Sequence, residues 1–359
     1  MKKIIDPCFH KNILKTTFST TGWALCIGAG SSYPIFPDWK QLVEKLILTT
    51  NPDKAKLITD FLFKNYNADS IIHAAYNILE IDDVNFVGKL VDLLYSNIKN
   101  DCSDEDFKLI CNFLYRPHPE QHSFEQWKSF ISIRESYFSK ASAYNIARVI
   151  SKTINTDAAP SEIISFNGEP LLLSLLNSFI CENFYKTNPA PDKTPPRYVD
   201  LRNRSISNYH KNRISYILNH GQFPIPCHEK SHFQSSVDKL VFREGEYLSL
   251  ANSSFSWQSS TFLQISSSKP IVFLGVSLSD NNMRRWLTWV QDNRNKEIFS
   301  TSSENKYSTR HFWVCKKEND IEYCEWLSSI VFHLGVRIIW VDDWSHIEIK
   351  LEEMLGLSK

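Results

Sequence analysis

The stretch "GWALCIGAGSSYPIFPDW", residues 22–39, joins a short apolar run to a turn rich in glycine and serine. The run "WALCIG", residues 23–28, has the length and apolar character of a strand that is buried on both faces of a sheet. Beyond the turn, apolar residues in "DWKQLVEKLILTT", residues 38–50, recur at the i, i+3, i+4 spacing of a helix. The stretch therefore predicts a strand, a tight loop and a helix.

Apolar runs of strand length recur along the chain, with helical segments between several of them. They are "SEIISFN" (161–167), "ISYILNHG" (214–221), the start of "KPIVFLGVSLSDNNMRRWLTWV" (269–290), "RHFWVC" (310–315) and "VRIIWVDD" (336–343). This alternation predicts an α/β, Rossmann-like fold, with a largely parallel sheet and helices on both faces.

Two long segments depart from this alternation. Residues 53–155 show amphipathic helical segments and no convincing strand, and so predict a helical module. We expect this module to be inserted in, or packed on, a single domain that spans residues 1–359. Residues 187–213 are proline-rich and then basic, and predict a long surface connection.

Composition narrows the classes of function. Lys plus Arg and Asp plus Glu number 40 each, so no global charge draws the chain to nucleic acid or to an anionic membrane. The sequence has neither a signal peptide pattern nor an apolar run long enough to span a membrane, and we expect a cytoplasmic protein without a membrane role. The eight cysteines have no C-x-x-C pair and no zinc-site spacing, so we expect no metal.

The loop "GAGSS", residues 28–32, is the first candidate site. A helix N-terminus offers unpaired N–H groups, and glycine lets a phosphate approach the backbone closely, so the loop suits a pyrophosphate. The alternative is a tight turn in which Ser31 or Ser32 caps the helix. Tyr33 stands where the dehydrogenase fingerprint has a third glycine, and the acidic residue expected about 20 residues later is missing, which disfavours hydride transfer.

Two further candidate sites follow predicted strands. Asn167 and Glu169 lie in "IISFNGEPLLLSLL" (163–176), at the carboxyl end of a strand, where open α/β sheets bind ligands. Asn-Gly is also a hairpin signal, although a helical pattern follows it. His220 ends the strand in "ILNHGQF" (217–223) and is either a structural histidine or an imidazole that acts near neutral pH.

The last candidate site is "IVFLGVSLSDNN", residues 271–282. Gly275 and Ser277 follow a strand and are candidates for ligand contact. The alternative is that this segment only caps the next helix, through Ser279 or Asp280. Such a cap does not exclude contact of Gly275 and Ser277 with a ligand.

Taken in order, these stretches resemble the sirtuin-like (silent information regulator) superfamily, and in particular its bacterial anti-phage branch that hydrolyses NAD. The matching pieces, within residues 15–350, are "CIGAGSS" with "PDW", "ISFNGEPLL", "NHG", "FLGVSLSDNNMRRWL" and the pair "HFWV" and "LGVRIIWV". The resemblance implies that Gly28, Ala29, Gly30 and Ser31 contact the NAD phosphates and that Asp38 is the acidic residue of the family motif. It implies that Asn167 lies beside the nicotinamide ribose, Glu169 at the carboxamide position, and that His220 is the catalytic histidine. Gly275 and Ser277 would contact the adenosine side.

The chain also departs from the family pattern. Glu169 stands where the family usually has aspartate, and Gly168 where many members have a larger residue. Lys40 replaces the arginine that is common in the deacylase branch. The four-cysteine zinc ribbon of the deacylases is missing, which disfavours protein deacylation.

The resemblance implies an NAD hydrolase that yields ADP-ribose and nicotinamide in anti-phage, abortive-infection defence, when triggered or assembled with a partner. Such cleavage passes through an oxocarbenium-like state, and the positively charged leaving group needs no strong general acid. Asn167 would orient water or the ribose hydroxyls, and His220 would accept a proton. The alternatives are a silent sensor or scaffold that binds NAD or ADP-ribose, and an ADP-ribosyl transferase or deacylase.

The resemblance also implies a homo-oligomer and a defence-system partner protein, either an ATPase or a sensor of a nucleotide signal or nucleic acid. A basic patch of Arg202, Arg204, Lys211 and Arg213 is a further candidate contact for a nucleotide, nucleic acid or partner, or else a solvated loop.

Overall fold

A parallel β-sheet forms the centre of the computed structural model, which describes residues 22–188, 192–202, 213–226, 240–252, 256–301 and 309–357. Within these residues the sheet has seven strands in the order β3-β4-β2-β1-β5-β6-β7, and all neighbouring pairs are parallel. The strands are β1 (Ala24–Ile27), β2 (Glu162–Ser165), β3 (Val199–Arg202), β4 (Ile214–Leu218), β5 (Ile271–Leu274), β6 (His311–Lys316) and β7 (Val336–Val341).

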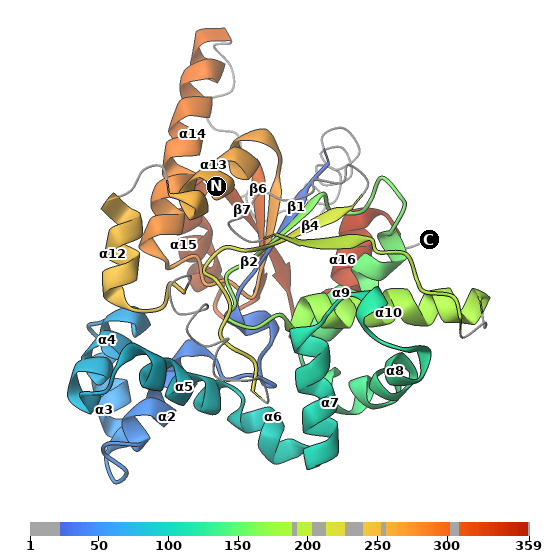
Figure 1. Cartoon of the computed structure of the whole chain (residues 1–359). Helices are drawn as coiled ribbons and strands as arrows, with labels where there is room; N and C mark the ends of the chain where they lie inside the picture. Colours follow the sequence, from blue (N-terminus) through green and yellow to red (C-terminus); the bar gives the residue numbers. More distant parts are fainter. Residues whose placement is uncertain are drawn as a thin grey trace.

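Both faces of the sheet are covered by helices, which confirms the predicted α/β, Rossmann-like class (Figure 1). Leu25 and Ile27 of β1 belong to one apolar core, while Ala24 and Cys26 belong to the other, because successive side chains of a strand point to opposite faces. The first core includes α9 (Ser142–Thr153), α10 (Leu171–Thr187) and α16 (Ile347–Leu355). The second includes α13 (Trp257–Ser268), α14 (Asn281–Thr301) and α15 (Ile321–Phe332).

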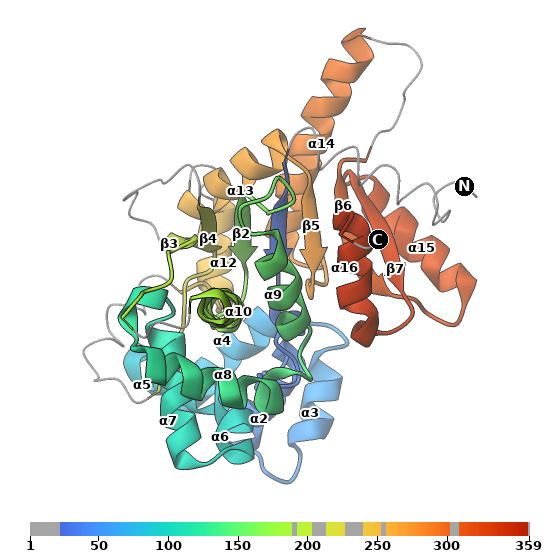
Figure 2. The same ribbon diagram turned by 90° about the vertical axis from the view of Figure 1, so that its right-hand side faces the viewer.

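The remaining helices gather beyond the end of the sheet to which the strand arrows point (Figure 2). They are α2 (Trp39–Leu48), α3 (Ala55–Leu62), α4 (Ala68–Leu79), α5 (Asp83–Leu94), α6 (Ser96–Asp101), α7 (Asp104–Tyr115) and α8 (Phe124–Phe138), with α12 (Glu244–Asn252) packed against α4. Residues 53–155 therefore hold helices and no strand. The single-domain organisation over residues 1–359 stays a prediction.

The segment 187–213 differs from the sequence-based expectation. Val199–Arg202 forms β3 and pairs with β4 at one edge of the sheet, so the prediction of a surface connection is wrong for these residues. Only the first two residues of β3 are buried, and prolines precede it, so the sequence pattern does not indicate this short edge strand. In the basic patch, Arg202 ends β3 and Arg213 pairs with Asp200, while Arg204 and Lys211 lie outside the described residues.

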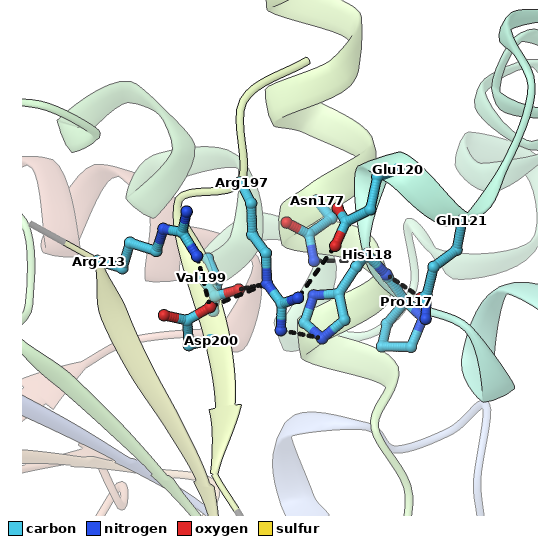
Figure 3. A network of polar contacts seen from close by, with 9 residues as sticks. All are labelled: Pro117, His118, Glu120, Gln121, Asn177, Arg197, Val199, Asp200 and Arg213. Carbon is cyan, nitrogen blue, oxygen red and sulfur yellow. Dashed lines mark hydrogen bonds and ion pairs between the residues drawn. The ribbon is translucent and has the colours of Figure 1, made fainter. Parts of the chain in front are cut away.

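Arg197 joins the edge of the sheet to the segment between α7 and α8 (Figure 3). Its guanidinium lies 2.9 Å from His118 Nε2, 3.0 Å from Glu120 Oε1 and 2.9 Å from Asp200 Oδ1. Burial, together with the positive charge of Arg197, lowers the pKa of His118 to about 4. The neutral imidazole thus accepts a hydrogen bond from Arg197.

The order of strands reverses beside β1. From β1 the chain adds β2, β3 and β4 on one side and then returns to place β5 on the other side. In open α/β sheets a crevice forms at such a switch point, outside the carboxyl ends of the strands. None of the helices in the described residues is long and apolar enough to cross a membrane.

Candidate functional site

Two glycine-containing loops interlock where β1 and β5 end. Gly28 donates its backbone N–H to Leu274 O at 3.1 Å, and Gly30 donates to Gly275 O at 3.0 Å. A Cβ on Gly28 would lie 2.6 Å from Gly275 O, and a Cβ on Gly275 would lie 2.3 Å from Ser31 N. Gly275 also has a φ of +64°, in the left-handed region that favours glycine. The backbone of residues 28–31 therefore lies in direct contact with the backbone of residues 274 and 275, and no side chain separates them.

The glycine loop continues into a short 3-10 turn, Ala29–Ser31, and not directly into an α-helix. Ser31 Oγ donates to Gly28 O at 2.8 Å within this turn, so the serine does not cap a helix. The first α-helix, α2, begins only at Trp39, where Asp38 accepts the backbone N–H of Gln41 at 2.8 Å. The prediction that a helix N-terminus lies at the glycine loop is wrong, because Pro34 and Pro37 separate the turn from the helix.

Asn167 and Glu169 form a buried polar cluster with the serines of the turn. Asn167 Nδ2 lies 2.9 Å from Glu169 Oε1 and 3.1 Å from Ser32 Oγ, and Ser32 Oγ donates to Glu169 Oε1 at 2.5 Å. Glu169 Oε2 also accepts the backbone N–H of Leu171 at 2.6 Å. Burial outweighs these donors and raises the pKa of Glu169 to about 7. The Oδ1 atom of Asn167 is buried and has no hydrogen-bond partner. The hairpin alternative at Asn167 is wrong, because β2 is followed by α10 and pairs only in parallel.

His220 follows β4 and points its two ring nitrogens to different surroundings. Nδ1 lies 3.3 Å from the hydroxyl of Tyr247, whereas Nε2 is buried without a partner. Phe166 and Tyr247 pack edge-on against the imidazole, with ring centroids 4.7 and 5.2 Å away. This burial lowers the pKa of His220 to about 3, so the imidazole is neutral at physiological pH.

A cleft of about 1130 Å³ lies over the switch point. Its lining includes seven of the residues singled out from the sequence: Gly28, Ala29, Gly30, Asp38, His220, Gly275 and Ser277. Ser31 is buried in the turn beneath it. Such a volume is slightly above the range of about 300–1,000 Å³ for pockets that bind small molecules and cofactors, and it is large enough for an extended dinucleotide.

Asn167 and Glu169 line a separate small chamber of about 30 Å³. Ala29 and Trp39 line both the chamber and the cleft, so the two cavities adjoin at these residues. Phe223 closes another side of the chamber, where its ring occupies the space that a side chain at position 168 would need. The sequence-predicted residues are thus divided between two adjoining cavities.

Acidic side chains lie at the end of the cleft formed by α4, α12 and the start of α14. Asp69, Glu244 and Asp280 line this end, and burial raises the pKa of Asp69, with further contributions from Glu244 and Asp280. Asp280 also accepts the backbone N–H of Met283 at 2.7 Å, so the expected cap of α14 is confirmed. Burial and the charges of Asp280 and Asp69 raise the pKa of Tyr247 well above its usual value.

Sequence reasoning missed Tyr247 and the acidic end of the cleft. Tyr247 is 27 positions from His220 in the sequence, and no spacing rule connects them. Only the packing of α12 against α4 and α14 brings the two together. Across the residues that the structure describes, no group of three His, Cys, Asp or Glu side chains has an arrangement that would hold a metal ion.

Comparison with known proteins identifies part of the chain. Residues 183–329 match the family model of a SIR2-like domain, and no curated protein matches the chain. The matched region contributes His220, Tyr247, Gly275 and Ser277, while the glycine loop at residue 28 and Asn167 precede it. Members of this family are NAD-dependent enzymes. Residues 183–329, less than half of the chain, are thus similar to the SIR2-like domains of the sirtuin-like superfamily.

Proposed function

We propose that the chain is an NAD glycohydrolase, which cleaves the bond between nicotinamide and ribose and releases ADP-ribose and nicotinamide. One observation carries this proposal: a single cleft joins the interlocked glycine loops to His220 and adjoins the chamber of Asn167 and Glu169. The backbone of the glycine loops lines the cleft without side chains at Gly28, Gly30 and Gly275, which lets the diphosphate of a dinucleotide approach it closely.

The chemistry needs few groups from the protein. Nicotinamide leaves as a neutral molecule because its ring nitrogen is positively charged in NAD, and the ribose passes through an oxocarbenium-like state. The task of the site is to hold the ribose, exclude bulk water and position one attacking water. The acidic residues at one end of the cleft, Asp69 and Asp280 among them, favour a ribose that carries positive charge.

We assign the proton-accepting role to Nε2 of His220. Burial lowers the pKa of His220 to about 3 and keeps the imidazole neutral, as a proton acceptor must be; an acceptor works best with a pKa near the working pH, so this role requires bound substrate to raise the pKa. For Nε2 to accept, Nδ1 must carry the ring proton and donate it to the Tyr247 hydroxyl, 3.3 Å away. Tyr247 then holds the ring in the tautomer that the reaction needs.

We assign the orientation of water or of the ribose hydroxyls to Asn167. Its Nδ2 is engaged by Glu169 and Ser32, which fixes the direction of the amide, while its Oδ1 has no partner and is available to accept a hydrogen bond. Glu169 acts through Asn167 as a positioning residue and borders the chamber that would receive the nicotinamide carboxamide.

We further propose that the activity is held back until a trigger or partner acts, as expected for an enzyme that depletes NAD in anti-phage defence. A chamber of about 30 Å³ has room for about one water molecule and is too small for a nicotinamide ring. The chamber must widen before the leaving group can lie against Asn167 and Glu169. Its present size supports a resting state.

The test is to incubate the purified full-length chain with NAD and to quantify nicotinamide and ADP-ribose by chromatography, alone and with candidate partners. Alanine at Asn167 or His220 should abolish release, while alanine at the exposed residues Asn65 and His346 should leave it unchanged. Full activity in both site variants would show that the site is misplaced.

A silent sensor of NAD or ADP-ribose is the second candidate, and the small chamber is the observation that favours it. This function predicts that NAD raises the unfolding temperature of the chain without any release of nicotinamide, under every condition tested. Release of nicotinamide would exclude it.

A further inference from the structure

The outer side of α15 carries a stripe of large apolar side chains in water. Tyr323, Trp326 and Ile330 are 69%, 72% and 48% exposed. Their spacing of three and four residues places them on one side of the helix, as neighbours along its axis. Isolated exposed apolar residues are common, but a contiguous group that includes a largely exposed tryptophan is typical of an interaction surface.

The orientation of this stripe is fixed by the other side of the helix. Cys324, Ser328 and Val331 are buried and face the sheet, where α15 packs against β7. The stripe therefore cannot turn inward without exposing these residues. Figure 2 shows α15 on the flank of the molecule, beside the edge strand β7.

Opposite charges lie at the two ends of this surface. Asp320 and Glu322 are at the N-terminal end of α15, and Glu325 is one turn further on. Arg284 of α14 reaches the C-terminal end, where its Nη2 lies 3.4 Å from Ile330 O. The pKa of the exposed His333 is lowered by burial and then by the charge of Arg284, which outweighs the opposite effect of Asp292. A surface with acidic and basic ends is complementary to a second copy of itself in the reversed direction.

We propose that α15 forms a homodimer interface, in which two copies pack their α15 helices antiparallel about a two-fold axis. Trp326 lies near the axis, Tyr323 meets Ile330 of the second copy, and Glu322 lies beside Arg284 of the second copy. Glu318 and Leu327 also line the end of the cleft, so the second copy would border each cleft. This proposal goes beyond the proposed function and does not depend on it.

The first test measures the mass of the full-length chain by light scattering and by sedimentation over a range of concentrations. We expect a dimer that Trp326→Glu weakens by about 30-fold or more, the effect of removing one hot-spot side chain. Leu57→Glu, which changes a side chain that is 70% exposed on α3, is the matched control and should leave the dimer intact. A monomer at all concentrations, or a dimer that Trp326→Glu does not weaken, overturns the proposal.

The second test examines the antiparallel register. Glu322→Arg and Arg284→Glu should each weaken the dimer, and the chain that carries both changes should recover it, because each new arginine meets a new glutamate. Circular dichroism checks that every variant is folded, and His333→Glu replaces Arg284→Glu if the loss of its intrachain hydrogen bonds unfolds the chain. A double variant no tighter than the single variants would refute this register.

Discussion

Replacing Gly275 by alanine tests whether the two glycine loops truly lie in direct contact. Two costs add at this position. A φ of +64° costs a residue with a Cβ about 1–2 kcal/mol. The new Cβ would also lie 2.3 Å from Ser31 N, a backbone atom that hydrogen bonds hold in place, and overpacking of this kind costs about 1–3 kcal/mol. We expect Gly275→Ala to lower the free energy of unfolding by about 2–5 kcal/mol.

Three other glycines separate these costs. Gly22 has a φ of +65° and open space around its Cβ position, so Gly22→Ala should show the backbone cost alone. Gly28 lacks the left-handed φ but would place a Cβ 2.6 Å from Gly275 O, so Gly28→Ala should show the packing cost alone. Gly88 lies inside α5 with nothing near its Cβ position, and Gly88→Ala should stabilise the chain by about 0.5–1 kcal/mol.

The assay is urea unfolding followed by tryptophan fluorescence and circular dichroism, repeated with and without NAD. We expect Gly275→Ala to be the least stable of the four variants and to lose the stabilisation by NAD, which Gly88→Ala should retain. If Gly275→Ala were as stable as Gly22→Ala, the contact between the loops would not exist, and the floor of the proposed NAD site would be wrong.

Three further predictions concern single side chains. Tyr247→Phe keeps the ring but removes the hydroxyl beside His220, and should lower kcat for nicotinamide release by roughly 10-fold with little change in KM; an unchanged kcat would refute the positioning role. Burial raises the pKa of Glu169 from 4.5 to about 7, so the folded chain holds this proton more tightly, and stability should fall by up to about 3 kcal/mol as pH rises from 4.5 to 7. Glu169→Gln should remove this loss, as measured by the difference in urea unfolding between variant and parent at pH 5 and pH 8. Burial lowers the pKa of His118 from 6.5 to about 4, with Arg197 adding to the effect, so its contribution should have the opposite sign and be lost as pH falls through this range. His118→Gln should reduce that loss, and identical acid sensitivity of variant and parent would contradict it.

The strands of the sheet could be predicted from the sequence because most are buried on both faces. All four residues of β1 and of β5 are buried, and each strand appears in the sequence as an uninterrupted apolar run. The edge strand β3 has no such signal, since only Val199 and Asp200 are buried, and its stability rests on pairing with β4 and on the contacts of Arg197. Those contacts join residues that lie 77 and 79 positions apart, and no local pattern reports them.

The candidate site was predictable where its residues end strands, and not where packing alone brings them together. Asn167 and His220 follow β2 and β4, which are adjacent in the sheet, so parallel pairing places both at the same edge. The hydrogen bond of Asn167 to Ser32 spans 135 positions, and the contact of His220 with Tyr247 depends on where α12 packs. Strand order places Asn167 near His220, whereas the contacts with Ser32 and Tyr247 depend on the complete tertiary structure.

The same contacts indicate which part of the site must move to admit nicotinamide. Gly28 and Gly30 are hydrogen-bonded to the strand end at Leu274 and Gly275, so Ala29 between them is held in place beside both cavities. Phe223 is held as well, because its backbone N–H donates to Gly168 O at 2.8 Å and its side chain is buried. Trp39, the first residue of α2, is half-buried and lines both cavities. Because Trp39 lies at the end of a helix, we expect a trigger or partner that activates the chain to act on the start of α2.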